Sequence, residues 1–280
     1  VRAALTRERR PELAPGHALV RVGVVGVCGS DLPRILTKGA HRLPIIPGHE
    51  FSGVVEDTNE VDLPVGQRVT VPPLIACFAC DSCARGEFSL CRDYDYFGSR
   101  QNGAYTELVS VPKANLVPVP DEVDDEAAAS VDPAAIALHG IMRAGISPGD
   151  RVAVVGAGPI GLFAVQWARI LGASHVLALD VVDQKLELAR ELGADAVERS
   201  DQPAEASGFD LVVETAGVPA AQNRAVMLAG PHGRVVLIGI PVADVTLELA
   251  TFNHLLREEI RVSGVWNSFS APFPGREWTT

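Results

Sequence analysis

The stretch VAVVGAGPIG, residues 152–161, limits the possible fold more than any other part of the sequence. A short apolar run leads directly into Gly156, Gly158 and Gly161 in a G-x-G-x-x-G arrangement, and a helical pattern follows. The first glycine permits a tight turn, the second lets the backbone approach a pyrophosphate, and the third allows close packing of helix on strand. The N-terminus of the helix stabilises phosphate charge. The stretch therefore predicts a strand–turn–helix unit that binds a dinucleotide.

Apolar runs on either side of this stretch predict two domains. From about residue 126 onward, RVAVVGAG, HVLALD, ADAVE, FDLVVETAG, GRVVLIG and IRVSGVW are spaced for alternating strands and helices. This pattern predicts a Rossmann fold, a doubly wound parallel sheet, over residues 126–280. Residues 1–125 contain short Val-, Gly- and Pro-rich runs such as EFSGVVED and GQRVTVPP, which predict strands broken by turns in a β-barrel-like domain.

The dinucleotide is predicted to be NAD. HVLALD ends in Asp180, nineteen residues after Gly161. An acidic residue at this place hydrogen-bonds the adenosine ribose and repels the extra phosphate of NADP. Lys185 could reach the same ribose, although a solvated lysine on a helix is the simpler interpretation. Further cofactor contacts are expected from Pro159, Ile160, Thr215 and Gly239, which lie in the glycine turn or at the ends of later strands.

Composition excludes several classes of partner. The chain of 280 residues has a net charge of −11 and a pI near 5.1, so it lacks the basic surface of a nucleic-acid-binding protein. Its apolar runs are broken well short of the ~20 residues that cross a membrane. The N-terminal segment lacks the apolar core of a signal peptide. We expect a cytoplasmic protein, and clustered cysteines in that reducing compartment bind metal more often than they form disulfides.

Four of the five cysteines are crowded into one short segment. Cys77, Cys80, Cys83 and Cys91 follow the pattern C-x2-C-x2-C-x7-C. Two-residue spacings let thiolates converge on one ion, and the longer loop brings back a fourth, which closes a tetrahedron. Four thiolates with no open position predict a structural zinc site. An iron–sulfur cluster and a pair of disulfides are the alternatives.

A second metal site is predicted from more widely separated residues. Cys28 follows an apolar run, His49 and Glu50 lie in PGHEFSG, and Asp132 precedes a proline at the entry to a helix. A thiolate, an imidazole and a carboxylate can form an open zinc site, whose fourth position is left for water or substrate. By spacing alone the inference is weak, because a lone cysteine is most often a small buried residue and a lone histidine is more often structural.

With these residues in hand, the sequence resembles the zinc-dependent medium-chain alcohol dehydrogenases over essentially its whole length. GVCGSD, GHE, the four-cysteine segment and GAGPIG occur in the order typical of that family. The resemblance implies a GroES-like domain that carries two zinc ions and a Rossmann domain that carries NAD. It implies that Cys28, His49 and Asp132 bind the catalytic zinc, with Glu50 coordinating or adjacent. Asp31 then corresponds to a residue that orients the histidine, and Ser30 to a hydroxyl that passes the substrate proton away.

The sequence departs from the family in three places. Asp132 occupies the place of a glutamate and is one methylene shorter. Pro33 occupies the place of a histidine that continues the proton relay in many members. Members also have a fuller first strand before Val1 and usually extend several tens of residues past Thr280, returning to the first domain. We therefore expect that the return segment is absent from this chain.

The resemblance also implies a substrate class and an assembly. The expected reaction is NAD-linked oxidation of a secondary alcohol in a sugar-alcohol phosphate. An unphosphorylated polyol as substrate and a relative that binds zinc and NAD without turnover are the alternatives. A homodimer is expected, with the strand EIRVSGVW pairing across a two-fold axis. The side chains considered for binding a phosphate are Arg34, Lys38, Arg42 and Arg100.

Overall fold

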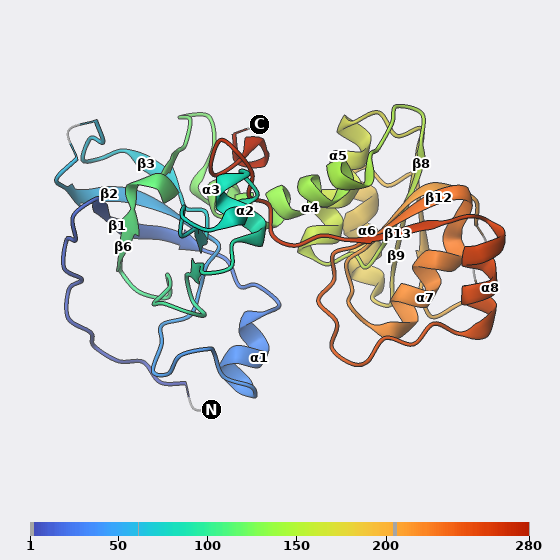
Figure 1. Ribbon diagram of the computed structural model, residues 1–280, viewed down its shortest axis with the longest axis horizontal. Coiled ribbons are helices and arrows are strands. Elements are labelled where there is room, and N and C mark those ends of the chain that lie inside the picture. The colour runs from blue at the N-terminus through green and yellow to red at the C-terminus, as the bar shows by residue number, and fades with distance from the viewer. Residues whose placement is uncertain (1–2, 61, 204–205, 280) are drawn as a thin grey trace. The chain divides into compact units, whose positions relative to one another are not determined.

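The computed structural model describes residues 3–60, 62–203 and 206–279. The chain forms two compact units, which are coloured along the sequence in Figure 1. The first contains the residues up to Asp132 together with the segment from Ser268 onward, and the second is Pro133–Asn267. None of the helices in the described ranges is long and apolar enough to span a membrane.

The first unit is built on a five-stranded antiparallel sheet with the strand order β6-β1-β2-β3-β7. Inward-facing side chains of these strands, including Val20, Phe51 and Val55, form its core with Phe97 from a neighbouring loop. A short hairpin of β4 and β5 lies outside this sheet. The strands and helices of this unit are β1 (His17–Val25), α1 (Asp31–Leu36), β2 (Phe51–Thr58), β3 (Arg68–Thr70), β4 (Leu74–Ile75), α2 (Asp81–Ala84), β5 (Asp95–Tyr96), β6 (Leu108–Pro112), β7 (Val117–Pro118) and α3 (Asp125–Ala129), with 3-10 turns at Phe88–Leu90, Lys113–Asn115 and Arg276–Trp278.

The second unit confirms the predicted Rossmann sheet. Its six strands are all parallel and have the order β10-β9-β8-β11-β12-β13, which is the 3-2-1-4-5-6 order of dinucleotide-binding folds. Alternate residues of each strand face opposite sides, so Val152 and Val154 pack under α4, α5 and α6, whereas Ala153 and Val155 pack under α7 and α8. The elements are α4 (Val131–Ala144), β8 (Arg151–Val155), α5 (Pro159–Ile170), β9 (His175–Asp180), α6 (Asp183–Glu191), β10 (Ala196–Arg199), β11 (Phe209–Glu214), α7 (Pro219–Leu228), β12 (Ala229–Leu237), α8 (Leu249–Arg257) and β13 (Arg261–Gly264).

The division between the units differs from the predicted boundary at residues 125 and 126. Helix α3 packs on β1, β2 and β3 of the first unit. Ser52 Oγ donates to the carbonyl of Asp125 at 2.7 Å, and Arg68 Nη2 lies 2.7 Å from Asp125 Oδ1. These polar contacts hold the start of the Ala-rich region on the first sheet. The change to an Ala-rich composition therefore comes before the chain enters the second unit.

The residues from Ser268 onward, predicted as part of the Rossmann domain, pack on the first unit. Phe269 exchanges hydrogen bonds with Ser89, whose Oγ accepts from the Phe269 amide at 2.7 Å and donates to its carbonyl at 3.1 Å. The Phe273 ring meets Phe78 and Phe88 edge to face, with centroids 5.3 and 5.4 Å apart. In Figure 1 this segment, in red, ends beside α2. Residues assigned to the Rossmann domain by their position in the sequence therefore belong to the first unit.

Candidate functional site

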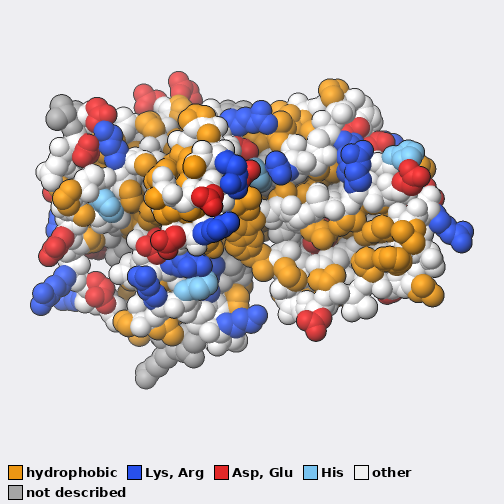
Figure 2. All heavy atoms as spheres, viewed as in Figure 1, with side chains coloured by type: hydrophobic (Ala, Val, Ile, Leu, Met, Phe, Trp, Pro, Cys, Tyr) orange, Lys and Arg blue, Asp and Glu red, His pale blue; other side chains and the backbone are white. Residues whose placement is uncertain are grey.

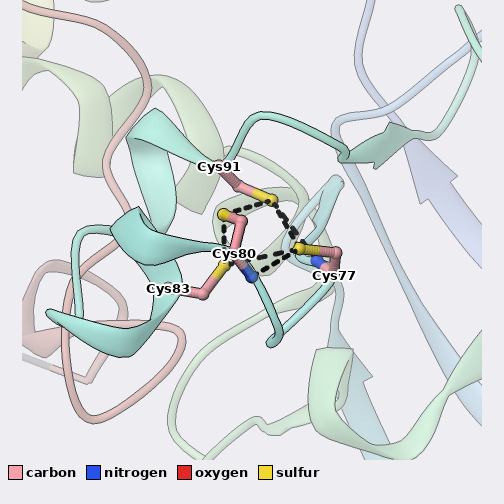
Figure 3. Close-up of side chains that lie close together, drawn as sticks. All are labelled: Cys77, Cys80, Cys83 and Cys91. Carbon is pink, nitrogen blue, oxygen red and sulfur yellow. Dashed lines mark hydrogen bonds between the residues drawn. The ribbon is translucent and has the colours of Figure 1, made fainter.

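The four clustered cysteines converge as their spacing predicts. Their sulfur atoms point toward one another in Figure 3, with Sγ–Sγ distances of 3.4 Å for Cys77 and Cys91, 3.6 Å for Cys80 and Cys83, 3.9 Å for Cys77 and Cys83, and 4.0 Å for Cys80 and Cys91. Zn–S bonds of about 2.3 Å in a tetrahedron place sulfur atoms about 3.8 Å apart. The cluster thus fits one zinc ion, and all five cysteines of the chain are free of disulfides.

Backbone amides favour the thiolate form of Cys77 and Cys80, whereas burial raises the pKa of the Cys83 and Cys91 thiols. Amides of Ala79 and Cys80 donate to Cys77 Sγ at 3.5 and 3.4 Å, and the Cys77 amide donates to Cys91 Sγ at 3.4 Å. Hydrogen bonds from the amides of Arg92 and Cys83 lower the pKa of the Cys80 thiol to about 6. Because no protein ligand position is left open, this cluster has the chemistry of a structural site.

The second cluster is assembled where two neighbouring strands end. Val25 of β1 pairs with Phe51 of β2, so the loop after β1 and the residues before β2 lie close together. Ligand atoms of Cys28, His49 and Glu50 all lie within 4.8 Å of one another. One sulfur, one nitrogen and one oxygen ligand form the donor set of an open zinc site, so these residues could hold the metal.

The charges around His49 suit a cation. Burial alone would lower the pKa of His49, but Asp31, Cys28 and Asp132 outweigh it and raise that pKa to about 10. Asp31 is fully buried, and its Oδ1 lies 3.4 Å from His49 Nδ1, an ion-pair distance. Tyr105 donates a hydrogen bond to Asp31 Oδ2 at 3.1 Å. This arrangement turns Nδ1 toward Asp31 and leaves Nε2 available for a metal.

Asp132 lies apart from the group of three. It is 3% exposed, yet the 4.8 Å group does not include it and its Oδ1 has no hydrogen-bond partner. Burial raises the pKa of the Asp132 carboxyl to about 7, opposed by His49 and assisted by Glu50. An uncompensated carboxylate at this depth is costly unless a cation lies nearby. The structure thus brings Cys28, His49 and Glu50 together, with Asp132 close enough to contribute charge.

Ser30 lies beside the cluster and is held from two sides. Its Oγ donates to Cys28 Sγ at 3.3 Å and accepts a hydrogen bond from Arg34 Nη1 at 3.0 Å. The same Arg34 nitrogen lies 3.4 Å from Asp31 Oδ1. The side chain of Pro33 has no donor or acceptor that could take part in a proton relay. Arg34, considered from sequence only as a phosphate ligand, therefore orients the serine hydroxyl.

Aromatic residues at the cluster were missed by sequence reasoning. The Tyr96 ring meets the His49 ring edge to face, with centroids 5.5 Å apart. Burial raises the pKa of the Tyr96 phenol well above its usual range, and the charges of Asp132 and Cys28 add to this effect. No spacing rule connects Tyr96 or Tyr105 to the metal ligands. Tyr96 was not singled out in the sequence, although it lies five residues after Cys91.

The glycine turn has the shape that a dinucleotide requires. Gly156 has a φ of +100°, and Thr215 Oγ1 donates to its carbonyl at 2.8 Å. A Cβ on Gly161 would lie 1.8 Å from the Gly156 carbonyl oxygen, whereas a Cβ on Gly158 would meet nothing within 4 Å. The space over Gly158, at the N-terminus of α5 where Pro159 and Ile160 begin the helix, can accept a pyrophosphate.

The remaining predicted cofactor residues lie at the carboxyl ends of the parallel strands. Asp180 ends β9, and its carboxylate accepts hydrogen bonds from the amides of Ala157 at 2.8 Å and Val182 at 3.0 Å. Lys185 Nζ lies 3.8 Å from Asp180 Oδ2. Each carboxylate oxygen keeps a lone pair for a ribose hydroxyl. Thr215 follows β11, and Gly239, which follows β12, approaches Gly217 so closely that its Cβ would lie 2.2 Å from the Gly217 nitrogen.

Comparison with known proteins identifies the family. The alcohol dehydrogenase GroES-like domain matches residues 14–121, and the zinc-binding dehydrogenase domain matches residues 159–277. Galactitol 1-phosphate 5-dehydrogenase of Escherichia coli K12 is 39% identical over 272 residues, which cover 93% of this chain and 79% of that protein. The chain belongs to the zinc-dependent medium-chain alcohol dehydrogenases. Zinc and a nicotinamide dinucleotide are therefore its cofactors.

Other members of this dehydrogenase family are also similar to this chain in sequence and structure. Sorbitol dehydrogenase of Bacillus subtilis is 32% identical over 82% of this chain and 70% of its own length. The crystal structure of galactitol-1-phosphate dehydrogenase from Escherichia coli superposes with a TM-score of 0.93 at 38% identity, covering 98% of this chain and 83% of that one. An NADP-bound zinc-binding dehydrogenase from Sinorhizobium meliloti gives a TM-score of 0.86 at 33% identity, covering 92% and 80%. These relatives are oxidoreductases, and this chain is an oxidoreductase of the same family.

Proposed function

We propose that this dehydrogenase oxidises a secondary alcohol of a sugar-alcohol phosphate with NAD, and that galactitol 1-phosphate is converted to tagatose 6-phosphate. The observation that carries the proposal is the Cys28–His49–Glu50 group with Ser30 beside it, in a chain 39% identical to galactitol 1-phosphate 5-dehydrogenase. NAD is favoured over NADP because an acidic residue at the end of the second strand of such a sheet, here Asp180, hydrogen-bonds the adenosine ribose and repels an additional phosphate.

The chemistry divides between cofactors and side chains. When bound, zinc supplies a Lewis acid that lowers the pKa of the substrate hydroxyl, and NAD accepts the hydride from the carbinol carbon. Cys28, His49 and Glu50 would hold the zinc, and Asp132 adds negative charge beside them. Asp31 fixes the orientation of His49 through the contact at 3.4 Å.

Ser30 has the task of moving the proton. Its hydroxyl accepts the proton of the substrate hydroxyl and gives up its own. Arg34 cannot receive that proton, because a guanidinium stays protonated in proteins and has no acceptor. Its hydrogen bond at 3.0 Å instead holds the Ser30 oxygen in place. With Pro33 in the relay position, the proton passes from Ser30 to water.

The test is NADH formation by the purified holoenzyme with galactitol 1-phosphate, galactitol and sorbitol. The proposal predicts the highest kcat/KM for the phosphate ester and a preference for NAD over NADP. A higher kcat/KM for sorbitol would contradict it and favour the unphosphorylated polyol alternative, which the likeness to sorbitol dehydrogenase supports. Glu50→Gln should lower zinc content and kcat/KM more than Asp132→Asn does, because only Glu50 lies within the group of three.

We also propose a homodimer formed through β13. This strand is at one edge of the six-stranded sheet, and all four of its residues are exposed. Val262 is 41% and Trp266 48% exposed, and Figure 2 shows hydrophobic side chains gathered on this part of the second unit. An unpaired edge of this kind pairs readily with a second copy across a two-fold axis. Light scattering on the purified protein should give twice the chain mass, and a monomer would contradict the proposal. A cytoplasmic location remains a prediction.

A further inference from the structure

A row of rings, formed by His49, Tyr96 and Tyr94, links the metal-binding cluster to Arg100. Tyr96 ends β5, and Tyr94 lies two residues before it. The Tyr96 ring lies 5.5 Å from the His49 ring, and the Tyr94 ring lies 6.4 Å from Tyr96. The guanidinium of Arg100 lies over the Tyr94 ring, 4.5 Å from its centroid. The row therefore runs from a metal ligand to a cation in steps of 4.5–6.4 Å.

The loop that carries Arg100 is fixed against the loop that carries His49. Amides of Arg100 and Gln101 donate to the Tyr96 carbonyl at 3.0 and 3.2 Å, which closes a tight turn. A Cβ on Gly98 or Gly103 would lie 2.8 and 2.0 Å from backbone atoms of Gly48. Only glycine permits this approach of two backbones. Because the turn is held in this way, the position of Arg100 relative to the metal ligands is set by the fold.

Arg100 differs from the other basic side chains considered for a phosphate. Arg34 is already engaged by Ser30 and Asp31. Lys38 and Arg42 are exposed on the loop after α1. Arg100 is half-buried, and among the described residues its guanidinium has no hydrogen bond or ion pair, only the stacking on Tyr94. Stacking leaves the N–H groups at the edge of the guanidinium plane free, in the fork geometry that matches a phosphate.

We propose that Arg100 binds the phosphate of the substrate and that Tyr94 and Tyr96 line the path of the polyol chain between phosphate and metal. This assignment rests on the proposed function and makes Arg100 the residue that selects phosphorylated over unphosphorylated polyols. In galactitol 1-phosphate the phosphate is on C1, whereas the proposed reaction oxidises C5, near the other end of the chain. Arg100 has the same relation to the Cys28–His49–Glu50 group, at the opposite end of the row of rings.

The test compares Arg100→Met with the matched control Arg42→Ala in the zinc-loaded enzyme. Methionine keeps an apolar stem on Tyr94 and removes the charge. The ratio of kcat/KM for galactitol 1-phosphate to that for galactitol should fall about tenfold to a hundredfold in Arg100→Met, chiefly through KM, because a hydrogen-bonded charge is lost. Arg100→Lys should give an intermediate ratio, since lysine retains charge without the fork. Inorganic phosphate should inhibit the wild type more strongly than Arg100→Met.

The outcomes separate this inference from the proposed function. A wild type that prefers the phosphate ester, with the same preference in Arg100→Met and Arg100→Lys, overturns the role of Arg100 and leaves the proposed function intact. The role is also overturned if Arg42→Ala lowers the ratio as much as Arg100→Met does. A wild type with no preference for the ester overturns both. A lowered ratio confined to the Arg100 variants supports the assignment.

Discussion

The two metal-binding clusters of the first unit use different designs for different tasks. The four cysteines come from fifteen consecutive positions, carry like ligands and leave no position open. Cys28 comes from one segment and the adjacent His49 and Glu50 from another. Together they offer three kinds of ligand atom, and they are supported by Asp31, Ser30 and Tyr105. The closed cluster of Cys77, Cys80, Cys83 and Cys91 can only stabilise the segment that carries it, which is here called the lobe. The mixed cluster of Cys28, His49 and Glu50 leaves a ligand position where substrate can bind.

Loss of a ligand should have its largest effect on catalysis at the mixed cluster. Cys28→Ser should lower kcat/KM by about a thousandfold, because removal of the Lewis acid costs about 4 kcal/mol of transition-state stabilisation. The variant should lose one zinc per chain while its thermal midpoint stays within a few degrees of the wild type. Steady-state kinetics and elemental analysis provide the measurement, and retention of activity with one zinc lost would break the comparison.

The corresponding change at the closed cluster should affect stability. Cys91 is 4% exposed, and Cys91→Ser should remove the metal that links the ends of the lobe. If this link contributes about 3 kcal/mol, as cross-links over loops of this length do, the thermal midpoint should fall by about 6–12 °C. Differential scanning calorimetry measures the change. An unaltered midpoint after loss of zinc would show that the lobe is held by other contacts, such as those of Phe269 and Phe273.

Substitution of Asp31, which contacts the metal-binding His49, should have an intermediate effect on zinc affinity and kcat/KM. Asp31→Asn keeps the shape of the side chain but removes the charge that faces His49 Nδ1 at 3.4 Å. Zinc affinity or kcat/KM should fall about tenfold to a hundredfold, which is typical when the partner of a metal-binding histidine is lost. Asp57→Asn, at a half-exposed carboxylate on β2, is the matched control and should change neither quantity. Equal effects of the two variants would contradict the role of Asp31.

Glu214 is a buried carboxylate away from both metal-binding clusters. Its substitution should change stability less than the substitutions above change stability or activity. It is fully buried, its Oε1 accepts from the amides of Ala216 and Gly217 at 2.8 and 2.7 Å, and its Oε2 has no partner. Burial raises its pKa above 4.5. The folded state therefore holds this proton more tightly than the unfolded chain, so the contribution of Glu214 to stability falls as the pH rises through the unfolded and then the folded pKa.

This titration should make the difference in thermal midpoint between Glu214→Gln and the wild type depend on pH. Glu214→Gln keeps the acceptor for both amides but cannot ionise. The thermal midpoint of the variant minus that of the wild type should increase as the pH rises from about 4 to about 7. A difference that stays constant over this range would show that Glu214 does not titrate differently in the folded and unfolded states.

Features encoded by neighbouring residues could be predicted from sequence. The cysteine spacing determines which sulfur atoms can converge, and the pattern of Gly156, Gly158 and Gly161 determines the turn before α5. Both are local, so both were predicted. The association of Cys28 with His49 depends on the pairing of β1 with β2, and it was inferred mainly through family resemblance.

Features that depend on distant contacts could not be predicted. Tyr105 reaches Asp31 across the fold, from a position 74 residues later in the sequence. The segment after Ser268 returns to the first unit through aromatic contacts with Phe78 and Phe88 that no spacing rule reveals. Asp132, in the first turn of α4, lies outside the group of three, and no spacing in the sequence indicated this.

The most direct test of the account measures zinc per chain, activity and thermal midpoint together while a chelator removes zinc from the wild type. We predict two zinc ions per chain. The first to leave should abolish NADH formation with little change in the midpoint, because the mixed cluster is open on one side, and loss of the second should lower the midpoint. A protein that binds only one zinc yet forms NADH, or whose activity and stability fall in parallel as a single zinc is removed, would contradict the division of labour between the two clusters.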